Sequence, residues 1–211
     1  MTAAWTRASV GLCLCTLLVG CADRTIRLRY APDEPIIPVT AAQPLTIFKF
    51  ADRRGPKGDQ GDPLRVGVIY AANGGRIGTV TTDTSFLRTL TEALVAGFKA
   101  RGVEAVGLPD RELVVGTPFD TPLALGGDIQ YFSAESWWTR SAQITGMIRV
   151  YDRQGALLVE KRVSAQEQAG MASVFIPMAK ILEELLNTAL REFVRTVVTD
   201  AAVTKQLVNP R

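Results

Sequence analysis

The sequence predicts an α+β fold, a two-layer sandwich in which two helices cover one face of a mostly antiparallel sheet. Segments 83–102 and 177–197 carry apolar residues at helical spacings of three, four and seven. Segments between 128 and 163 instead alternate apolar and polar residues, which is typical of strands with one buried face. Because an amphipathic helix must bury its apolar stripe, the two patterns together favour helices packed on a sheet.

The first four strands are predicted at 45–50, 64–70, 76–80 and 103–107. Asn73-Gly74-Gly75 separates the second strand from the third and has the composition of a hairpin turn. The same glycines lack the GxGxxG spacing of a phosphate-binding loop, so a hairpin is the better interpretation. Residues 108–123 contain three prolines and are predicted to form a loop.

Three further strands form the most regular part of the predicted sheet, at 128–138, 142–150 and 157–163. Asp152-Arg153-Gln154-Gly155 has the composition of the turn between the last two. Strict alternation puts Ile129 and Tyr131 on one face of the first strand and Phe132 on the other. On the following strands the predicted buried residues are Ala142, Ile144, Gly146, Ile148, Val150, Leu157, Val159 and Val163. The three strands are therefore predicted to form an antiparallel meander.

Both helices carry recognisable end signals. Asp83 is predicted to cap the first helix at its N-terminus, and Gly102 stands where a left-handed residue would end it. Pro177 suits the first turn of the second helix. The apolar stripes comprise Phe86, Leu87, Leu90, Leu94 and Phe98 in the first helix, and Met178, Ile181, Leu182, Leu185, Ala189, Phe193 and Val197 in the second.

Residues 1–20 have the layout of a cleaved secretory signal. Arg7 supplies a positive charge, and the apolar run at 10–19 is too short to favour a membrane-spanning helix. Leu18, Val19, Gly20 and Cys21 resemble the bacterial lipobox, in which the cysteine thiol forms a thioether to diacylglycerol. An ordinary secretory signal followed by a chance cysteine is the alternative. We predict cleavage before Cys21 and lipid attachment to its sulfur.

Cysteine use and proline content divide the rest of the chain. Cys13 and Cys15 lie in the predicted signal, so Cys21 would be the single cysteine left after cleavage. Residues 21–44 are rich in proline and are interpreted as an extended tether, although a short edge strand around Ile26 and Leu28 is an alternative. Residues 45–211 are predicted to form one α+β domain.

The residue inventory argues against an enzyme. The chain has no histidine, which removes Ser-His-Asp and Cys-His arrangements and the usual zinc sites. Asp52, Asp59 and Asp62 could hold a cation loosely, but they do not form an EF-hand pattern, and a solvated loop is preferred. No cofactor, metal or catalytic residue is predicted. The 24 Lys and Arg nearly balance the 21 Asp and Glu, so nucleic-acid binding is not expected.

Trp137 and Trp138 form the candidate partner-binding site. Neighbouring residues of a strand point to opposite faces, so at most one of the two indoles can enter a single core layer. The other would be buried under a loop or the tether, or would stay exposed to a protein or glycan partner. Burial is the simpler alternative.

The order of features resembles the YajG-type family of bacterial lipoproteins. The stretches that carry the resemblance are LVGCAD, LTIFKFADRRG, RIGTVTTDTSFLRTLTEALVAGFKARGVEAV, GGDIQYFSAESWW, SAQITGMIRVYDRQGALLVEKRVSAQEQ and IPMAKILEELLNTALREFVRTVVTDAAVTKQLV. The resemblance implies a small lipid-anchored periplasmic domain and transfers no catalytic residue. The pattern is also similar to auxiliary lipoproteins of envelope transport systems.

Function is therefore predicted at the level of the cell envelope. The leading hypothesis is a non-catalytic binding or accessory module, held on a membrane by its N-terminal lipid and docked against an envelope protein. The alternative is an auxiliary lipoprotein of an ABC- or MCE-type assembly that transports lipid or lipopolysaccharide. Ala22, which directly follows Cys21, favours the outer membrane, on the periplasmic side; the inner membrane is the weaker expectation because Asp23 comes next.

Overall fold

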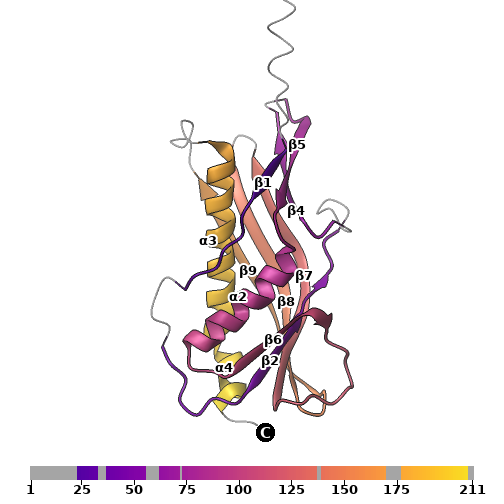
Figure 1. Ribbon diagram of the computed structural model, residues 1–211, viewed down its shortest axis with the longest axis vertical. Coiled ribbons are helices and arrows are strands. Elements are labelled where there is room, and N and C mark those ends of the chain that lie inside the picture. Colours follow the sequence, from indigo (N-terminus) through magenta and orange to yellow (C-terminus); the bar gives the residue numbers. More distant parts are fainter. Residues whose placement is uncertain are drawn as a thin grey trace, which may run out of the picture.

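The computed structural model describes residues 23–32, 37–55, 62–71, 73–136, 139–169 and 177–208 (Figure 1). Its strands are β1 (Arg24–Ile26), β2 (Leu45–Lys49), β3 (Ala51–Asp52), β4 (Arg65–Tyr70), β5 (Arg76–Thr82), β6 (Ala105–Glu112), β7 (Leu123–Ser136), β8 (Arg140–Asp152) and β9 (Leu157–Ala169). Its helices are α2 (Phe86–Ala100), α3 (Met178–Thr199) and α4 (Ala201–Val208). Among these residues, no helix is long and apolar enough to cross a bilayer.

Strand β7 is the centre of the sheet. Along one edge it pairs with β8, which pairs with β9, and both pairings are antiparallel. Its other edge is shared by three shorter strands, with β2 at its beginning, β3 in the middle and β4 at its end, all parallel to it. The sheet therefore forks into one branch of β2 and β6 and another of β4, β5 and β1.

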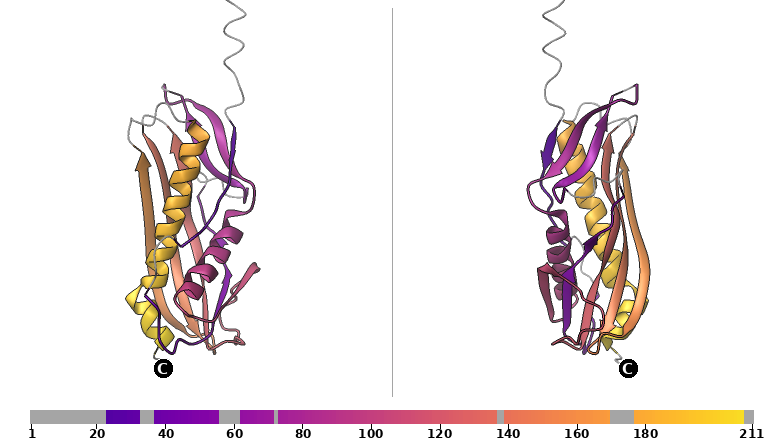
Figure 2. Two further views of the ribbon diagram at one scale, coloured as in Figure 1. Left: turned by 60° about the vertical axis from the view of Figure 1, so that its left-hand side comes forward. Right: turned by 90° about the vertical axis from the view of Figure 1, so that its right-hand side faces the viewer.

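Two helices cover one face of this sheet, as Figure 2 shows from the side. Helix α2 packs on β2 and β6, and α3 packs on β8, β9 and β7. The core between the layers includes fully buried side chains from both, such as Ile47, Leu90, Phe132, Ile144 and Phe193. The predicted α+β class and its two covering helices are confirmed.

A β-bulge corrects the face assignment in β7. The register with β8 shifts between Ile129 and Tyr131, which leaves Gln130 as an extra residue. Ile129 and Phe132 consequently share the core, with 0% and 1% of their surface exposed. The predicted alternation, which put them on opposite faces, is wrong because one added residue reverses every side chain beyond it. A second shift, between Val150 and Tyr151, leaves Leu157 exposed, where the sequence predicted burial.

The helix ends follow the predictions in part. Ser85, and not Asp83, is the N-cap of α2, whereas Gly102 adopts the expected left-handed conformation with φ of 80°. The predicted single closing helix is interrupted at Asp200, so α3 and α4 are separate. The Asp200 carboxylate accepts hydrogen bonds from the amides of Ala202 and Val203, which caps α4.

Part of the segment that was interpreted as a tether belongs to the folded domain. Strand β1 pairs in parallel with β5, and Ile26 and Leu28 are buried in the main core. Beyond β1, the amide of Arg27 donates to Glu183 on α3, and the amide of Arg29 donates to Asn187. The alternative of an edge strand near Ile26 is therefore correct for this stretch. Strand β6, similarly, extends to Glu112, into the predicted 108–123 loop.

Candidate functional site

The face of the sheet opposite the helices contains a hollow of about 230 Å³. Its walls come from the ends of β2 and β6, β3 and the residue after it, the first half of β7, the end of β8 and the loop after β6. Of these elements, β2 and β6 lie in the lower half of Figure 1, whereas β7 and β8 run through most of its height. The lining residues are Lys49, Ala51, Arg53, Glu112, Leu113, Val115, Gly127, Asp128, Arg149 and Tyr151.

The loop after β6 is held on this face by a small aromatic cluster. The ring of Phe119 lies between Phe48, at a centroid distance of 5.5 Å, and Tyr151, at 6.5 Å. The amide of Phe119 donates to the carbonyl of Arg153 at 2.9 Å. Beneath the loop, Gly126 allows the side chain of Leu113 to come within 3.2 Å of where a Cβ would stand. The loop thus forms a packed wall of the hollow.

Arg149 forms ion pairs with two acidic residues at the hollow. Its guanidinium donates to Asp128 at 2.7 Å and to Glu160 at 2.6 Å. Burial lowers the pKa of Arg149, but the hydrogen bonds to Glu160 and Asp128 outweigh it, so that the pKa lies above its usual value. Arg149 therefore lies between the two carboxylates and forms an ion pair with each of them.

Two other cations of the hollow are less constrained. Lys49 lies 3.9 Å from Glu112, the long limit of an ion pair, and both side chains are partly exposed. The Arg53 amide donates to the carbonyl of Ile129, whereas its guanidinium makes no hydrogen bond or ion pair with any residue that the structure describes. Beside them Val115 is 67% exposed. The hollow can therefore offer a partner two cationic groups and an adjoining apolar contact.

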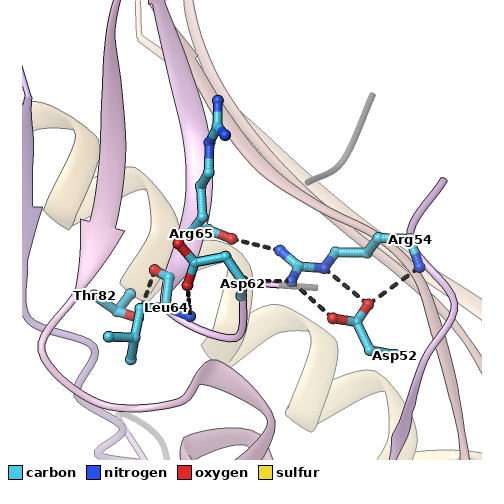
Figure 3. A network of polar contacts seen from close by, with 6 residues as sticks. All are labelled: Asp52, Arg54, Asp62, Leu64, Arg65 and Thr82. Carbon is cyan, nitrogen blue, oxygen red and sulfur yellow. Dashed lines mark hydrogen bonds and ion pairs between the residues drawn. The ribbon is translucent and has the colours of Figure 1, made fainter. Parts of the chain in front are cut away.

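Arg54, one residue further along, has a different role. Its side chain is fully buried, and Figure 3 shows it between the loop before β4 and the end of β3. Its guanidinium donates to both carboxylate oxygens of Asp52 and to the carbonyls of Asp62 and Arg65. The carboxylate of Asp62 accepts from the amide of Leu64. Both acids therefore stabilise the protein's own chain.

Asp59, the third acid of the segment for which a solvated loop was preferred to a cation site, lies outside the described residues. Within the ranges that the structure describes, no group of three His, Cys, Asp or Glu side chains could hold a metal ion. The glycines at 74 and 75 form the expected hairpin turn, in which Gly74 has φ of 81° and the Ala71 amide donates to the Gly75 carbonyl.

A second feature lies at the opposite end of the sheet, where the described chain begins. The carboxylate of Asp23 accepts hydrogen bonds from the amide of Thr79 on β5 at 2.8 Å and from its hydroxyl at 2.7 Å. These two bonds, the hydroxyl first, hold the pKa of Asp23 below its usual value; the positive charges of Arg76 and Arg24 act in the same direction. The beginning of β1 is thereby fastened to β5.

The structure does not describe the lipobox residues or the two tryptophans that the sequence singled out. Leu18, Val19, Gly20, Cys21, Trp137 and Trp138 are outside the described residues. The structure brings together Lys49, Arg53 and Arg149, which sequence reasoning missed, because exposed basic residues on separate segments look like an ordinary solvated surface. One usable signal was the pair Gly126-Gly127 directly before the strand predicted at 128–138, since glycine next to or within a strand often marks a close approach of other chain segments.

Comparison with known proteins gives a likeness of fold. No family model matches the chain, and no curated protein matches it. Protein XCC0632 from Xanthomonas campestris, assigned to the family model DUF330, has a TM-score of 0.61 at 12% identity, over 86% of this chain and 96% of that one. Hypothetical protein CT253 from Chlamydia trachomatis has a TM-score of 0.48 at 8% identity, over 81% of this chain and 100% of that one.

A minor lipoprotein from Acinetobacter baumannii is also similar, with a TM-score of 0.40 at 11% identity, over 81% of this chain and 93% of that one. Identities this low show a fold at most and carry no function across. The resemblance to the YajG-type family thus stays a prediction. The chain shares its α+β fold with the Xanthomonas protein.

Proposed function

We propose that the protein is a lipid-anchored accessory module of the cell envelope that binds a partner and catalyses no reaction. The observation that supports it best is the pair of hydrogen bonds between Asp23 and Thr79. Cys21, the cysteine of the predicted lipobox, stands two residues before Asp23. A lipid on its sulfur would therefore be joined directly to the folded sheet.

One end of the sheet would then face the membrane, and the other would bind the partner. The β4–β5 hairpin and β1 lie in the upper part of Figure 1, whereas β2 and β6, whose ends line the hollow, lie in the lower half. Lipid at the upper end would leave the hollow, with Lys49, Arg53 and Val115 in its lining, in a part of the sheet away from the anchor. We propose that this surface docks an envelope protein through an acidic segment, since cations beside an exposed apolar residue suit such a partner.

The alternative of a transport auxiliary that carries an amphiphile calls for an apolar cleft. The described hollow is lined mainly by charged and polar residues, and its volume of about 230 Å³ is small for an acyl chain and headgroup. Docking of a protein is thus the better match to this surface.

The anchor is tested by metabolic labelling with a palmitate analogue in cells that produce Cys21→Ala. We expect this variant to lose the label and to leave the membrane fraction, because no other cysteine would remain in the mature chain. Cys13→Ala is the matched control and should keep both properties, since residue 13 lies in the predicted signal. Labelled, membrane-bound Cys21→Ala would refute the anchor.

Docking is tested by placing a photo-crosslinking amino acid at Val115 in the lipidated protein. A crosslinked envelope protein is expected there, and its yield should fall several-fold when Arg53→Glu is added, because the charge reversal repels an acidic segment. The control position is Arg162, which is exposed on β9. Equal crosslinking at both positions, or no effect of Arg53→Glu, would argue against docking at the hollow.

A further inference from the structure

We propose that the β4–β5 hairpin end of the domain rests on the phospholipid headgroups of the membrane that holds the protein, and that the contact between Asp23 and Thr79 sets this orientation. The proposal depends on the lipid at Cys21 in the proposed function. It adds a defined membrane-facing surface, comprising Arg24, Arg76 and Ile77.

The first step concerns how firmly the described N-terminus is held. Asp23 accepts two hydrogen bonds from Thr79, and the next three residues pair with β5 as strand β1. Ile26 is fully buried, and the amide of Arg27 donates to Glu183 on α3. The chain from residue 24 onward therefore cannot leave the sheet without breaking strand pairing and uncovering a core side chain, and the two bonds to Thr79 hold Asp23 in line with it.

The second step concerns the length of chain between the sheet and the lipid. A trans peptide separates consecutive Cα atoms by about 3.8 Å, so two residues reach at most about 7 Å from Asp23 to Cys21. The prolines that were interpreted as a spacer follow β1 in the sequence. They connect β1 to β2 and cannot lift the domain away from the lipid.

The third step identifies which residues of β5 lie as far along the strand direction as Cys21 can reach. Strands β1 and β5 are parallel, so moving from Thr79 back to Ile77 follows the same direction as moving from Asp23 toward Cys21. Two residues of a strand rise about 6.6 Å, which brings Ile77 to the height that Cys21 can reach. The hairpin turn at Asn73 and Gly74 continues beyond Ile77. This end of the sheet must consequently approach the headgroup layer.

The chemistry of these residues fits that layer. Ile77 is 54% exposed, although it is a large apolar side chain in a strand. Arg76 directly precedes it, Arg24 pairs with Val80 further along β5, and both arginines are exposed. The carboxylate of Asp23 already accepts two hydrogen bonds from Thr79. Arginine attracts lipid phosphates, and an isolated apolar side chain can enter the boundary between headgroups and acyl chains. Contact with a bilayer surface would account both for the exposed arginines and for the exposed Ile77.

The experiment uses cysteine labelling, because a lipidated Cys21 would leave the mature chain without a free thiol. Ile77→Cys carries an environment-sensitive fluorophore in the lipidated protein, which is reconstituted into phosphatidylethanolamine–phosphatidylglycerol vesicles with nitroxide-labelled headgroups. Leu157→Cys is the matched control: it is 51% exposed, similar to Ile77 at 54%, and begins β9 at the opposite end of the sheet. We expect several-fold stronger quenching at position 77 than at position 157.

A third variant tests the orienting contact. Adding Asp23→Ala to each labelled protein removes both hydrogen bonds to Thr79 and should reduce the difference in quenching between positions 77 and 157 at least twofold. An unchanged difference would overturn the role of this contact. Protein that floats with the vesicles but shows equal quenching at both positions would overturn the proposed orientation alone. Protein that carries no lipid and fails to float would overturn the anchor, and the orientation with it.

Discussion

The guanidinium carbon of Arg54 lies 4.3 Å from the centre of the Phe86 ring, at the first residue of α2. The same guanidinium is paired with Asp52 at 2.8 Å. One buried side chain therefore connects the end of β3, the loop before β4 and the start of a core helix. An arginine that lies over an aromatic ring and has a carboxylate partner is stabilised through both contacts.

The first prediction concerns Asp52→Asn. It leaves the buried guanidinium without a charge partner, so we expect the free energy of unfolding, measured by urea denaturation, to fall by about 3–5 kcal/mol. The double variant with Arg54→Met should be more stable than Asp52→Asn alone, because it removes the unpaired charge. The control is Arg195→Met at an exposed ion pair with Glu192, where about 0.5 kcal/mol is expected. A small effect of Asp52→Asn would contradict this account of the pair.

The second prediction concerns the pH dependence of stability through Asp200. Burial raises its pKa, but hydrogen bonds from Lys161 and from the amides of Val203 and Ala202 prevail and hold the pKa below its usual value. The carboxylate therefore stabilises the folded state fully above the unfolded-state pKa of about 3.9. That contribution is lost as the pH falls through the lower folded-state pKa.

The variant for this test is Asp200→Asn, which retains a side-chain oxygen to cap α4. At neutral pH we expect it to be less stable than wild type by on the order of 1–2 kcal/mol, because charge-assisted hydrogen bonds are lost. Urea unfolding measured at a series of pH values should show this difference shrinking toward strongly acidic pH. A difference that is the same at neutral and acidic pH would show that the Asp200 charge does not contribute.

The third prediction concerns Gly127, which lines the hollow from β7. Its φ of 154° and a Cβ that would stand 1.9 Å from the carbonyl oxygen of Met147 both disfavour any side chain. We expect Gly127→Ala to lower the free energy of unfolding by more than about 2 kcal/mol. Gly55→Ala is the control, since nothing lies within 4 Å of its added Cβ, and should change stability by less than about 1 kcal/mol. Comparable losses in both variants would count against the close contact.

The fourth prediction concerns Phe119→Ala in the loop that walls the hollow. Removing a ring that is 8% exposed and packed on Phe48 and Tyr151 should cost about 3 kcal/mol of stability. Hydrogen exchange should locate the change: amides of residues 113–119 should lose protection, whereas those in the middle of β8 and β9 should lose much less. Uniform loss of protection throughout the sheet would mean that the loop is not a separate packed unit.

Several elements could be predicted from the sequence because their signals are local. The hairpin at Asn73-Gly74-Gly75, the end of α2 at Gly102 and the turn that ends at Gly155 all need left-handed backbone, which glycine adopts readily. Helical periodicity located α2 and α3 because their apolar stripes repeat within one segment. Cys21, Trp137 and Trp138 are also local signals, and the roles assigned to them stay predictions.

Only the tertiary structure decided how distant segments meet. A short apolar strand does not reveal its partner, so the parallel pairing of β2, β3 and β4 with β7, and of β1 with β5, was not predicted. The bulge at Gln130 has no clear local signal, yet it reverses every side chain after it. The hollow with Arg53 and Arg149, and the contact of Asp23 with Thr79, arise from such pairings. Local residue preferences specify turns and helices, whereas a site made by separate strands depends on the register in which they pair.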